Sequence, residues 1–153
     1  MAHFEIQDLT FTYPTAGGRP SLTDVSLSIA PGEYVVLCGR SGSGKTTLLR
    51  HLKTVLTPQG KRSGRVLFCG KPLGEVTPEE QASRIGYVMQ NPDEQIVTDK
   101  VWHELAFGLE SLGCDQKTMR ARVAEMACYF GIQDWFHRDV DSLSGGQKKI
   151  LNL

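Results

Sequence analysis

The stretch of residues 39–46 constrains the fold and chemistry of this chain more than any other part. It reads GRSGSGKT and fits the pattern G-x-x-x-x-G-K-[ST] at every fixed position. Phosphate oxygens need several donors converging at close range, and glycine backbone can approach them without side-chain bulk. Apolar residues at helical spacing follow, and a helix N-terminus favours an anion through its free amides and dipole. The stretch therefore predicts a phosphate loop that opens onto a helix.

The residues of the phosphate loop have separate expected roles. Lys45 is placed to reach the β- and γ-phosphates, which makes it a candidate catalytic residue. The Thr46 hydroxyl is a candidate Mg²⁺ ligand, and Thr47 is a candidate donor to an outer phosphate oxygen. The residues expected to contact the nucleotide here are Gly39, Ser41, Gly42, Ser43, Gly44, Lys45, Thr46 and Thr47. The alternative is an ordinary Gly/Ser-rich turn, which the flanking strand and helix patterns disfavour.

The overall charge excludes some classes of partner. Lys plus Arg and Asp plus Glu both number 17, so the formal net charge is zero. No nucleic-acid partner is expected, because proteins grip phosphate backbones with surplus Lys and Arg. No apolar stretch approaches the roughly 20 residues that span a bilayer. A protein of this composition that serves a membrane is expected to be cytoplasmic and peripheral on the inner face of that membrane.

Cysteine and histidine spacing argues against a structural metal site. The sequence contains no C-x-x-C pair, and we expect Cys38 and Cys128 to be small buried hydrophobes in a reducing compartment. His103 begins an H-E-x-x-H pattern, but the second histidine is replaced by Phe107, which excludes that zinc motif. The isolated histidines are expected at the surface or in the core with satisfied hydrogen bonds; they are His3, His51 and His137.

The hydrophobic pattern predicts alternating strands and helices. Strands are expected at residues 4–13, 25–29, 34–38, 66–69 and 85–89. The run 34–38 is continuously apolar, which is typical of a strand buried on both faces. Helices are expected at residues 48–56, from Pro78, at 101–112, from the cap Asp115 to Phe130, and from Gly145. The expected fold class is therefore α/β.

A second glycine motif narrows the family. Residues 143–147 read LSGGQ, which resembles the signature motif of ABC ATPases and follows the phosphate loop as it does in that family. A serine hydroxyl and glycine amides at a helix start again suit an anion. The resemblance implies that ATP and Mg²⁺ are bound, and that this motif closes over ATP held by a second ABC ATPase subunit. The residues it assigns are Ser144, Gly145, Gly146 and Gln147.

The resemblance extends to residues between and before the two motifs. Tyr13 stands where the family places an aromatic that stacks on adenine. Gln90 resembles the Q-loop glutamine, which implies roles in catalysis and in holding Mg²⁺. Residues 90–107, from Gln90 to Phe107, look like those of energy-coupling-factor and cobalt-type importer ATPases, which implies contact there with a transmembrane transporter subunit. Tyr13 could instead be a strand tyrosine with a buried ring, and Gln90 a plain turn residue.

The resemblance also implies an architecture for residues 1–153. It is a P-loop NTPase of ABC type, with an N-terminal antiparallel β part, an incomplete RecA-like parallel core and a helical signature subdomain at about residues 91–153. The family's Walker B carboxylates and switch histidine follow the signature helix, and none is recognisable here. We therefore expect a domain truncated after the signature, an exposed apolar edge at residues 34–38, and little hydrolysis by this chain alone.

The leading hypothesis is an ATP-binding subunit of an ABC importer, which dimerises across ATP to drive transport by a membrane partner. A soluble ABC protein acting on ribosomes or DNA stays open, although DNA-structuring members carry a long coiled coil that is absent between the two motifs. A nucleotide-binding fragment without an enzymatic role is the third hypothesis. Comparison of ATP affinity with ATPase rate distinguishes it from the first.

Overall fold

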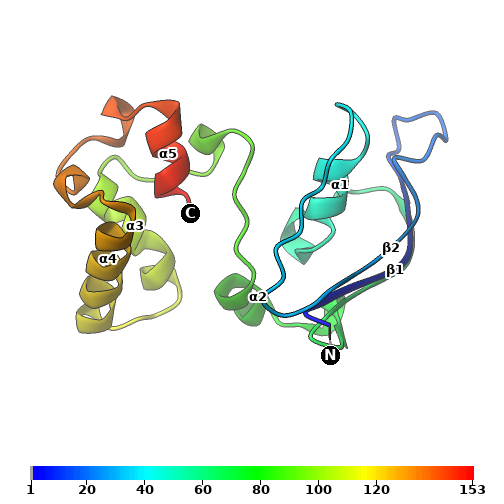
Figure 1. Ribbon diagram of the computed structural model, residues 1–153, viewed down its shortest axis with the longest axis horizontal. Coiled ribbons are helices and arrows are strands. Elements are labelled where there is room, and N and C mark those ends of the chain that lie inside the picture. The colour runs from blue at the N-terminus through cyan, green and yellow to red at the C-terminus, as the bar shows by residue number, and fades with distance from the viewer. Residues whose placement is uncertain (1) are drawn as a thin grey trace. The chain divides into compact units, whose positions relative to one another are not determined.

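The computed structural model describes residues 2–153, which form two compact units. The first, here called the sheet unit, runs to Gln81, and the second, the helical unit, runs from Ala82 to Leu153. The sheet with α1 belongs to the sheet unit, and α3, α4 and α5 belong to the helical unit (Figure 1). No helix of residues 2–153 has the length and apolar character needed to cross a bilayer.

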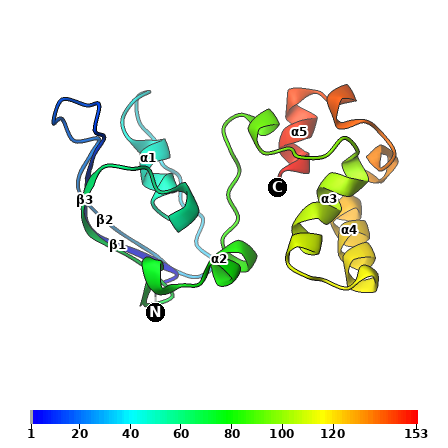
Figure 2. The same ribbon diagram turned by 180° about the vertical axis from the view of Figure 1, so that it is seen from behind.

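The sheet unit is built on an antiparallel sheet of four strands in the order β2-β1-β3-β4. The strands are β1 (Phe4–Thr12), β2 (Leu22–Ile29), β3 (Lys61–Phe68) and β4 (Lys71–Pro72). Figure 2 shows this sheet beside α1 from the reverse side. The predicted strands at 4–13, 25–29 and 66–69 are therefore confirmed, and so is the antiparallel N-terminal part of the predicted α/β fold.

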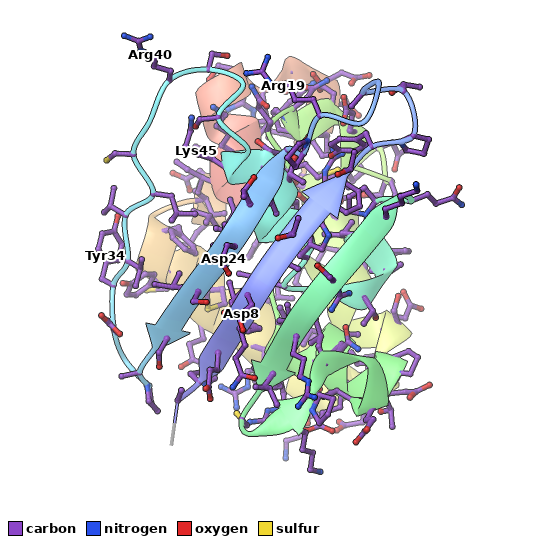
Figure 3. All side chains as sticks on the ribbon, turned by 90° about the vertical axis from the view of Figure 1, so that its right-hand side faces the viewer. Asp8, Arg19, Asp24, Tyr34, Arg40 and Lys45 are labelled. Atoms are coloured by element: carbon purple, nitrogen blue, oxygen red, sulfur yellow. The ribbon has the colours of Figure 1, made fainter. Side chains whose placement is uncertain are left out.

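An irregularity in β1 explains why its apolar residues only nearly alternate. The pairing register shifts between Ile6 and Leu9 against β2, and Asp8 has a positive φ of 50° there. The Asp8 backbone N–H donates to Ser26 Oγ at 2.9 Å, which holds the bulge against β2 (Figure 3). As a result Ile6 and Leu9, three positions apart, are both buried, at 2% and 0% exposure.

The helix after the phosphate loop is shorter than predicted. α1 covers Lys45–Arg50, and a separate 3₁₀ turn, η1, covers Thr54–Leu56. The Thr54 N–H and hydroxyl both donate to Gln81 Oε1, at 3.0 and 2.9 Å, so this backbone is held by a buried side chain from α2 instead of a helical ladder. The predicted helix over 48–56 was therefore wrong beyond its first turns, because a distant glutamine competes for the backbone.

Two predicted strands are absent from the described residues. Residues 34–38 and 85–89 are assigned to no strand, and neither belongs to the sheet of residues 2–153. The run 34–38 is exposed instead of buried, with Tyr34 at 91% and Val36 at 64% exposure (Figure 3). The expectation of a buried strand was thus wrong: Tyr34, Val35 and Val36 are exposed, but they form no strand edge. A strand needs hydrogen-bonding neighbours, and apolar sequence alone cannot supply them.

The helical unit contains the predicted helices at close to their predicted bounds. They are the end of α2 (Pro78–Arg84), α3 (Val101–Ser111), α4 (Gln116–Phe130) and α5 (Gly145–Leu151). Short 3₁₀ turns lie at η2 (Leu73–Glu75) in the sheet unit, and at η3 (Pro92–Glu94), η4 (Gln133–Trp135) and η5 (Val140–Ser142) in the helical unit. Local side chains set these ends: Asp115 accepts from two backbone N–H groups of α4, and Gly131 ends it in the left-handed conformation.

A small apolar core joins α3 to α5. Val101, Val140, Leu143 and Leu151 are buried together, with Ile96, Leu105 and Trp135 packed around them. Burial of Leu143 beside this core anchors the chain immediately before the LSGGQ serine. Cys38 and Cys128 are both exposed free thiols, so the expectation that they are buried was wrong. Apolar neighbours in sequence did not imply apolar neighbours in space.

Candidate functional site

The phosphate loop begins its helix with a glycine in place of a side-chain cap. Gly44 is the N-cap of α1, with φ 91° in the left-handed region, and no side chain bonds to the cap. A Cβ at Gly44 would lie 2.5 Å from the Ser21 carbonyl oxygen, so a larger residue does not fit without a shift. A helix start leaves its first N–H groups without intrahelical partners. The uncapped first turn of α1 therefore keeps its N–H groups available for a ligand.

The Lys45 side chain lies across the inside of the loop. Its ammonium donates to the carbonyl oxygens of Gly39 and Arg40, at 2.9 and 2.7 Å, and to Ser43 Oγ at 3.3 Å. The Ser43 N–H also donates to the Arg40 carbonyl, at 3.2 Å, which closes the turn. These contacts place a positive charge at the centre of the loop, where it can meet an incoming phosphate (Figure 3).

The remaining loop residues are accessible. Ser41 and Thr46 are exposed, so their hydroxyls can face a ligand, while Thr47 is buried at 8% exposure. A cavity of about 480 Å³ lies between the loop and the turn before β2, lined by Ala16, Arg19, Pro20, Ser21, Gly42 and Ser43. Arg19 lines this cavity and adds a second cation besides Lys45. The sequence analysis did not identify Arg19 as a site residue.

Tyr13 and Thr47, which are 34 residues apart in the sequence, are brought together in the structure. The Tyr13 hydroxyl and Thr47 Oγ1 are 3.1 Å apart, and either one can donate. Thr47 is also contacted through its backbone, because His51 Nδ1 lies 2.7 Å from its carbonyl oxygen. The Phe11 ring packs edge-on against both Tyr13 and His51, at centroid distances of 4.8 and 4.7 Å. Tyr13, Thr47, Phe11 and His51 form one cluster, here called the Thr47 cluster.

His51 departs from its predicted environment. It is fully buried, at 0% exposure, and its Nε2 has no hydrogen-bond partner among the described residues. Burial lowers the pKa of this imidazole, the Thr47 carbonyl raises it, and Arg62 lowers it further, with a net decrease. The expectation of a surface or satisfied histidine was therefore wrong. No sequence signal marked it, because burial by Phe11 depends on tertiary packing.

The signature segment satisfies its own helix start. Ser144 is the N-cap of α5, its Oγ accepts from the Gln147 N–H at 3.3 Å, and Gln147 Oε1 accepts from the Ser144 N–H at 2.9 Å. This reciprocal pair is a capping box. Gly145 and Gly146 occupy the first turn, and a Cβ would meet nothing within 4 Å at either position. The segment is an exposed, preformed turn whose glycines leave the surface open.

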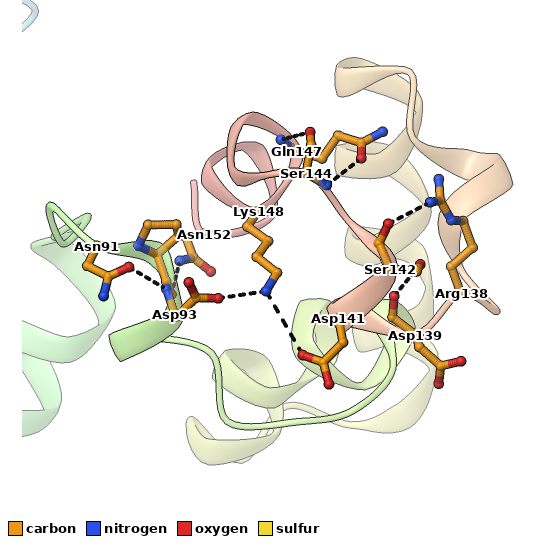
Figure 4. A network of polar contacts seen from close by, with 11 residues as sticks. Asn91, Asp93, Arg138, Asp139, Asp141, Ser142, Ser144, Gln147, Lys148 and Asn152 are labelled. Atoms are coloured by element: carbon orange, nitrogen blue, oxygen red, sulfur yellow. Dashed lines mark hydrogen bonds and ion pairs between the residues drawn. The ribbon is translucent and has the colours of Figure 1, made fainter.

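The Gln90 region connects to the signature helix through contacts that the sequence did not predict. Gln90 is exposed in a bend, and the following turn η3 is tied to α5 (Figure 4). Lys148 Nζ lies 2.6 Å from Asp93 Oδ1 and 4.0 Å from Asp141 Oδ1, and the Asn152 amide donates to the Pro92 carbonyl at 3.0 Å. The hydrogen bond with Asp93 raises the pKa of Lys148. A pairing across 55 residues leaves no local sequence signal.

The predicted site residues thus fall into two sets. The phosphate loop, Tyr13 and Thr47 lie together in the sheet unit, whereas Gln90 and residues 144–147 lie in the helical unit. Within residues 2–153 no group of three or more His, Cys, Asp or Glu side chains could hold a metal ion. Mg²⁺ sites of nucleotide-binding proteins commonly combine a few protein oxygens with substrate phosphates and water, so the exposed Thr46 hydroxyl does not need such a group beside it.

Comparison with known proteins gives consistent results at the levels of sequence and structure. The family model described as ABC transporter matches residues 22–153. A Bacillus cereus protein named as an ABC transporter ATP-binding protein is 46% identical over 153 residues, which cover 100% of this chain and 28% of that protein. The energy-coupling factor transporter ATP-binding protein EcfA1 of Lacticaseibacillus paracasei is 40% identical over 148 residues, covering 97% of this chain and 52% of that protein.

The same relationship holds among solved structures. The structure of cbiO1 from Clostridium perfringens, described as part of the ABC transporter complex cbiONQ, superposes with a TM-score of 0.81 at 27% identity, covering 99% of this chain and 59% of that one. The chain therefore spans between about a quarter and three fifths of the length of these relatives. A phosphate loop, an LSGGQ helix start, and a family match over residues 22–153 together show that this chain belongs to the ABC transporter family of ATP-binding proteins.

Proposed function

We propose that this chain is the ATP-binding part of an ABC importer subunit of the energy-coupling-factor type. The observation that carries the proposal is the loop at residues 39–46, which opens onto α1 through an uncapped glycine and holds the Lys45 ammonium inside it. That arrangement combines free amides, a helix start and a cation at one point, which suits a triphosphate. The relative EcfA1, named as an energy-coupling factor transporter ATP-binding protein, and cbiO1, part of an ABC transporter complex, support the transporter class.

Each residue of the sheet-unit site has a role in the proposal. An arriving phosphate exchanges with the loop oxygens that now accept from Lys45, so the ammonium turns from the loop carbonyls to the β- and γ-phosphates. The Tyr13 ring stacks on adenine, and the exposed Thr46 hydroxyl is a Mg²⁺ ligand. Bound Mg²⁺ would neutralise charge on the phosphates. Gln90 is proposed as its second protein ligand and as the residue that orients the attacking water.

The helical unit supplies contacts to other chains in this proposal. Ser144, Gly145, Gly146 and Gln147 close over ATP held by a second ABC ATPase subunit, either a copy of this chain or a related one. Their preformed and exposed helix start suits such a contact. Residues 90–107 are proposed to contact a transmembrane transporter subunit, which places the protein at the cytoplasmic face of a membrane. Closure of the ATPase pair around ATP would then move that partner.

The phosphate-loop assignment is tested by titration of MgATP into the chain and its Lys45→Ala variant. We expect saturable binding by the unsubstituted chain and loss of binding by the variant, with the circular dichroism spectrum largely kept. Lys61→Ala, on β3, is the matched control, because it removes one exposed ammonium elsewhere in the same unit. Unchanged ATP affinity in Lys45→Ala would refute the assignment.

The sandwich contact is tested by Ser144→Arg. We expect this variant to bind ATP as a monomer and to lose ATP-dependent pairing, measured by analytical ultracentrifugation with the longest available form of the protein. Dimerisation of normal strength would count against the proposed contact. For the 153-residue chain we further expect ATP binding without appreciable turnover, so a phosphate-release assay should stay at background while the titration saturates.

A further inference from the structure

A buried histidine fixes the helix that carries the phosphate loop. α1 has six residues, and its carbonyl at Thr47 accepts from the His51 backbone N–H at a long 3.3 Å. The same carbonyl is 2.7 Å from His51 Nδ1, which is the shorter contact. Helices this short are marginal without tertiary support. His51 provides that support, since its ring packs on Phe11 of β1 while its nitrogen bonds the helix backbone.

The contact defines the protonation state of the imidazole. A carbonyl oxygen can only accept, so Nδ1 carries the proton and donates to Thr47. Nε2 is then an unprotonated acceptor, buried without a partner among the described residues. A buried polar atom left unpaired costs free energy, and an apolar side chain at this position would avoid that cost. The hydrogen bond from Nδ1 to the Thr47 carbonyl offsets the cost of the unpaired Nε2.

Thr47 is contacted through both its side chain and its backbone. These two contacts link the phosphate-binding turn to Tyr13, the proposed adenine-stacking residue. Its carbonyl is bonded by His51 and its side-chain hydroxyl by Tyr13. Thr47 directly follows Lys45 and Thr46, and these three residues form the first turn of α1. Movement of Thr47 would therefore shift the phosphate-binding turn and release the Tyr13 ring at the same time.

We propose that His51 is a positioning residue for nucleotide binding, which acts through Thr47 to hold the phosphate-binding turn and the Tyr13 ring in register. It touches no part of the nucleotide itself. This inference rests on the proposed ATP site and adds a residue that neither the loop motif nor the LSGGQ motif contains.

Two substitutions separate the ring of His51 from its hydrogen bond. His51→Phe keeps an aromatic ring against Phe11 but has no donor for the Thr47 carbonyl. His51→Asn keeps a donor at the place of Nδ1 but loses most of the ring. With the 153-residue chain and MgATP as the probe, we expect His51→Phe to bind about tenfold more weakly at unchanged or raised thermal stability. His51→Asn should retain most of the affinity despite lower stability.

A cycle with Tyr13→Phe tests whether the cluster acts as one unit. If Tyr13 and His51 act through the same Thr47, the double variant loses less affinity than the product of the two single losses. Leu48→Ala is the matched control, because it weakens packing of α1 at a buried position without removing either contact to Thr47. It should lower thermal stability and leave MgATP affinity nearly unchanged below the transition.

The outcomes separate this inference from the proposed function. Two results would overturn the role of His51 but not the proposed function. One is MgATP affinity that falls in step with thermal stability across all variants, and the other is normal MgATP binding by His51→Phe. Absence of saturable MgATP binding by the unsubstituted chain would refute the proposed function itself. Should His51→Phe fail to fold, ¹⁵N NMR of the unsubstituted chain decides: an imidazole protonated only at Nδ1 is expected at neutral pH, and the Nε2–H tautomer would overturn the proposal.

Discussion

The two glycine-rich helix starts of this chain are similar in sequence and opposite in construction. α1 begins at Gly44, in a left-handed conformation and with no side-chain cap. α5 begins at Ser144, in an extended conformation and with a complete capping box from Gln147. At the start of α1, no side chain caps the free backbone N–H groups. At the start of α5, the Gln147 N–H already donates to Ser144.

The difference suggests distinct uses for the two turns. An uncapped start binds an anion strongly because the ligand replaces the missing cap, and Lys45 stabilises the loop until the ligand arrives. A capped start is rigid before any ligand is present, so it can meet a surface presented by another chain with little ordering cost. The sheet unit is thus suited to take up the nucleotide, and the helical unit to recognise it once bound.

One methyl group added to each turn is expected to have the largest difference in effect. Gly44→Ala introduces a Cβ that meets the Ser21 carbonyl at 2.5 Å, at a φ of 91°. We expect a loss of about 2 kcal/mol in the free energy of unfolding and no measurable ATP binding. Urea denaturation and ATP titration measure the two effects.

Gly145→Ala is the matched change in the signature turn, where a Cβ meets nothing within 4 Å. Its stability should stay equal or rise slightly, since alanine favours a helix. Equal destabilisation by the two substitutions would remove the distinction between the turns.

Removal of the signature cap should have the next largest effect. Ser144→Ala loses the oxygen that accepts from the Gln147 N–H, which should cost about 1 kcal/mol of local stability. Hydrogen exchange should speed up in α5, while ATP affinity of the phosphate loop stays unchanged. Ser142→Ala, which removes a hydroxyl just before the cap, serves as the control for a general effect on this segment. Slow exchange in α5 of Ser144→Ala would contradict the structural role of the cap.

Acid should affect the sheet unit through His51, whereas His103 and His137 of the helical unit are exposed. Burial of His51 lowers its pKa below 6.5, and the groups facing it are the Thr47 carbonyl and the Arg62 guanidinium. As pH falls below about 6.5, His51 binds a proton in the unfolded chain but stays neutral in the folded one. The free energy of unfolding therefore falls until the pH reaches the lower pKa of His51 in the folded state. Urea midpoints from pH 8 to 5 measure this loss.

His51→Phe removes this titration, and its stability should vary less with pH over the same range. Equal pH dependence in the two proteins would show that other groups cause the acid sensitivity. The measurement needs no nucleotide, so it is independent of the proposed function.

The smallest expected effect concerns the ion pair between η3 and α5. Lys148→Met keeps most of the aliphatic length but removes the ammonium 2.6 Å from Asp93. Ion pairs with an exposed partner contribute little, so the melting temperature should barely change, and faster hydrogen exchange is expected in residues 91–95. Lys149→Met is the neighbouring control. A large fall in melting temperature with Lys148→Met alone would show that this contact is a core element of the helical unit.

Local features were the ones that the sequence predicted well. The cap at Asp115, the stop at Gly131, the serine start of α5 and the phosphate loop all depend on residues within a few positions of each other. Predictions failed wherever a partner was distant. The run 34–38 reads as a buried strand but pairs with no strand among residues 2–153, and Thr54 leaves the helical ladder for Gln81.

The nucleotide-binding roles of the site residues stay predictions, and the structure adds contacts to them. The motif residues, Tyr13 included, were named from the sequence, and the structure added the contact of Tyr13 with Thr47. His51, Arg19 and the Asp93–Lys148 pair were missed, because each gains its role from a neighbour that lies far away in the chain.

By itself the sequence determined the family, the two glycine turns and the boundaries of α3, α4 and α5, because backbone conformation and capping are set by short-range sterics and hydrogen bonds. The same local residues leave the turn at Gly44 open and close the turn at Ser144 with a capping box. Tertiary structure alone decided that a histidine seven residues beyond Gly44 is buried against Phe11 and bonded to the helix that begins there. Such contacts depend on which surfaces pack together when the strands and helices assemble, and a local sequence pattern does not predict which distant residues come into contact.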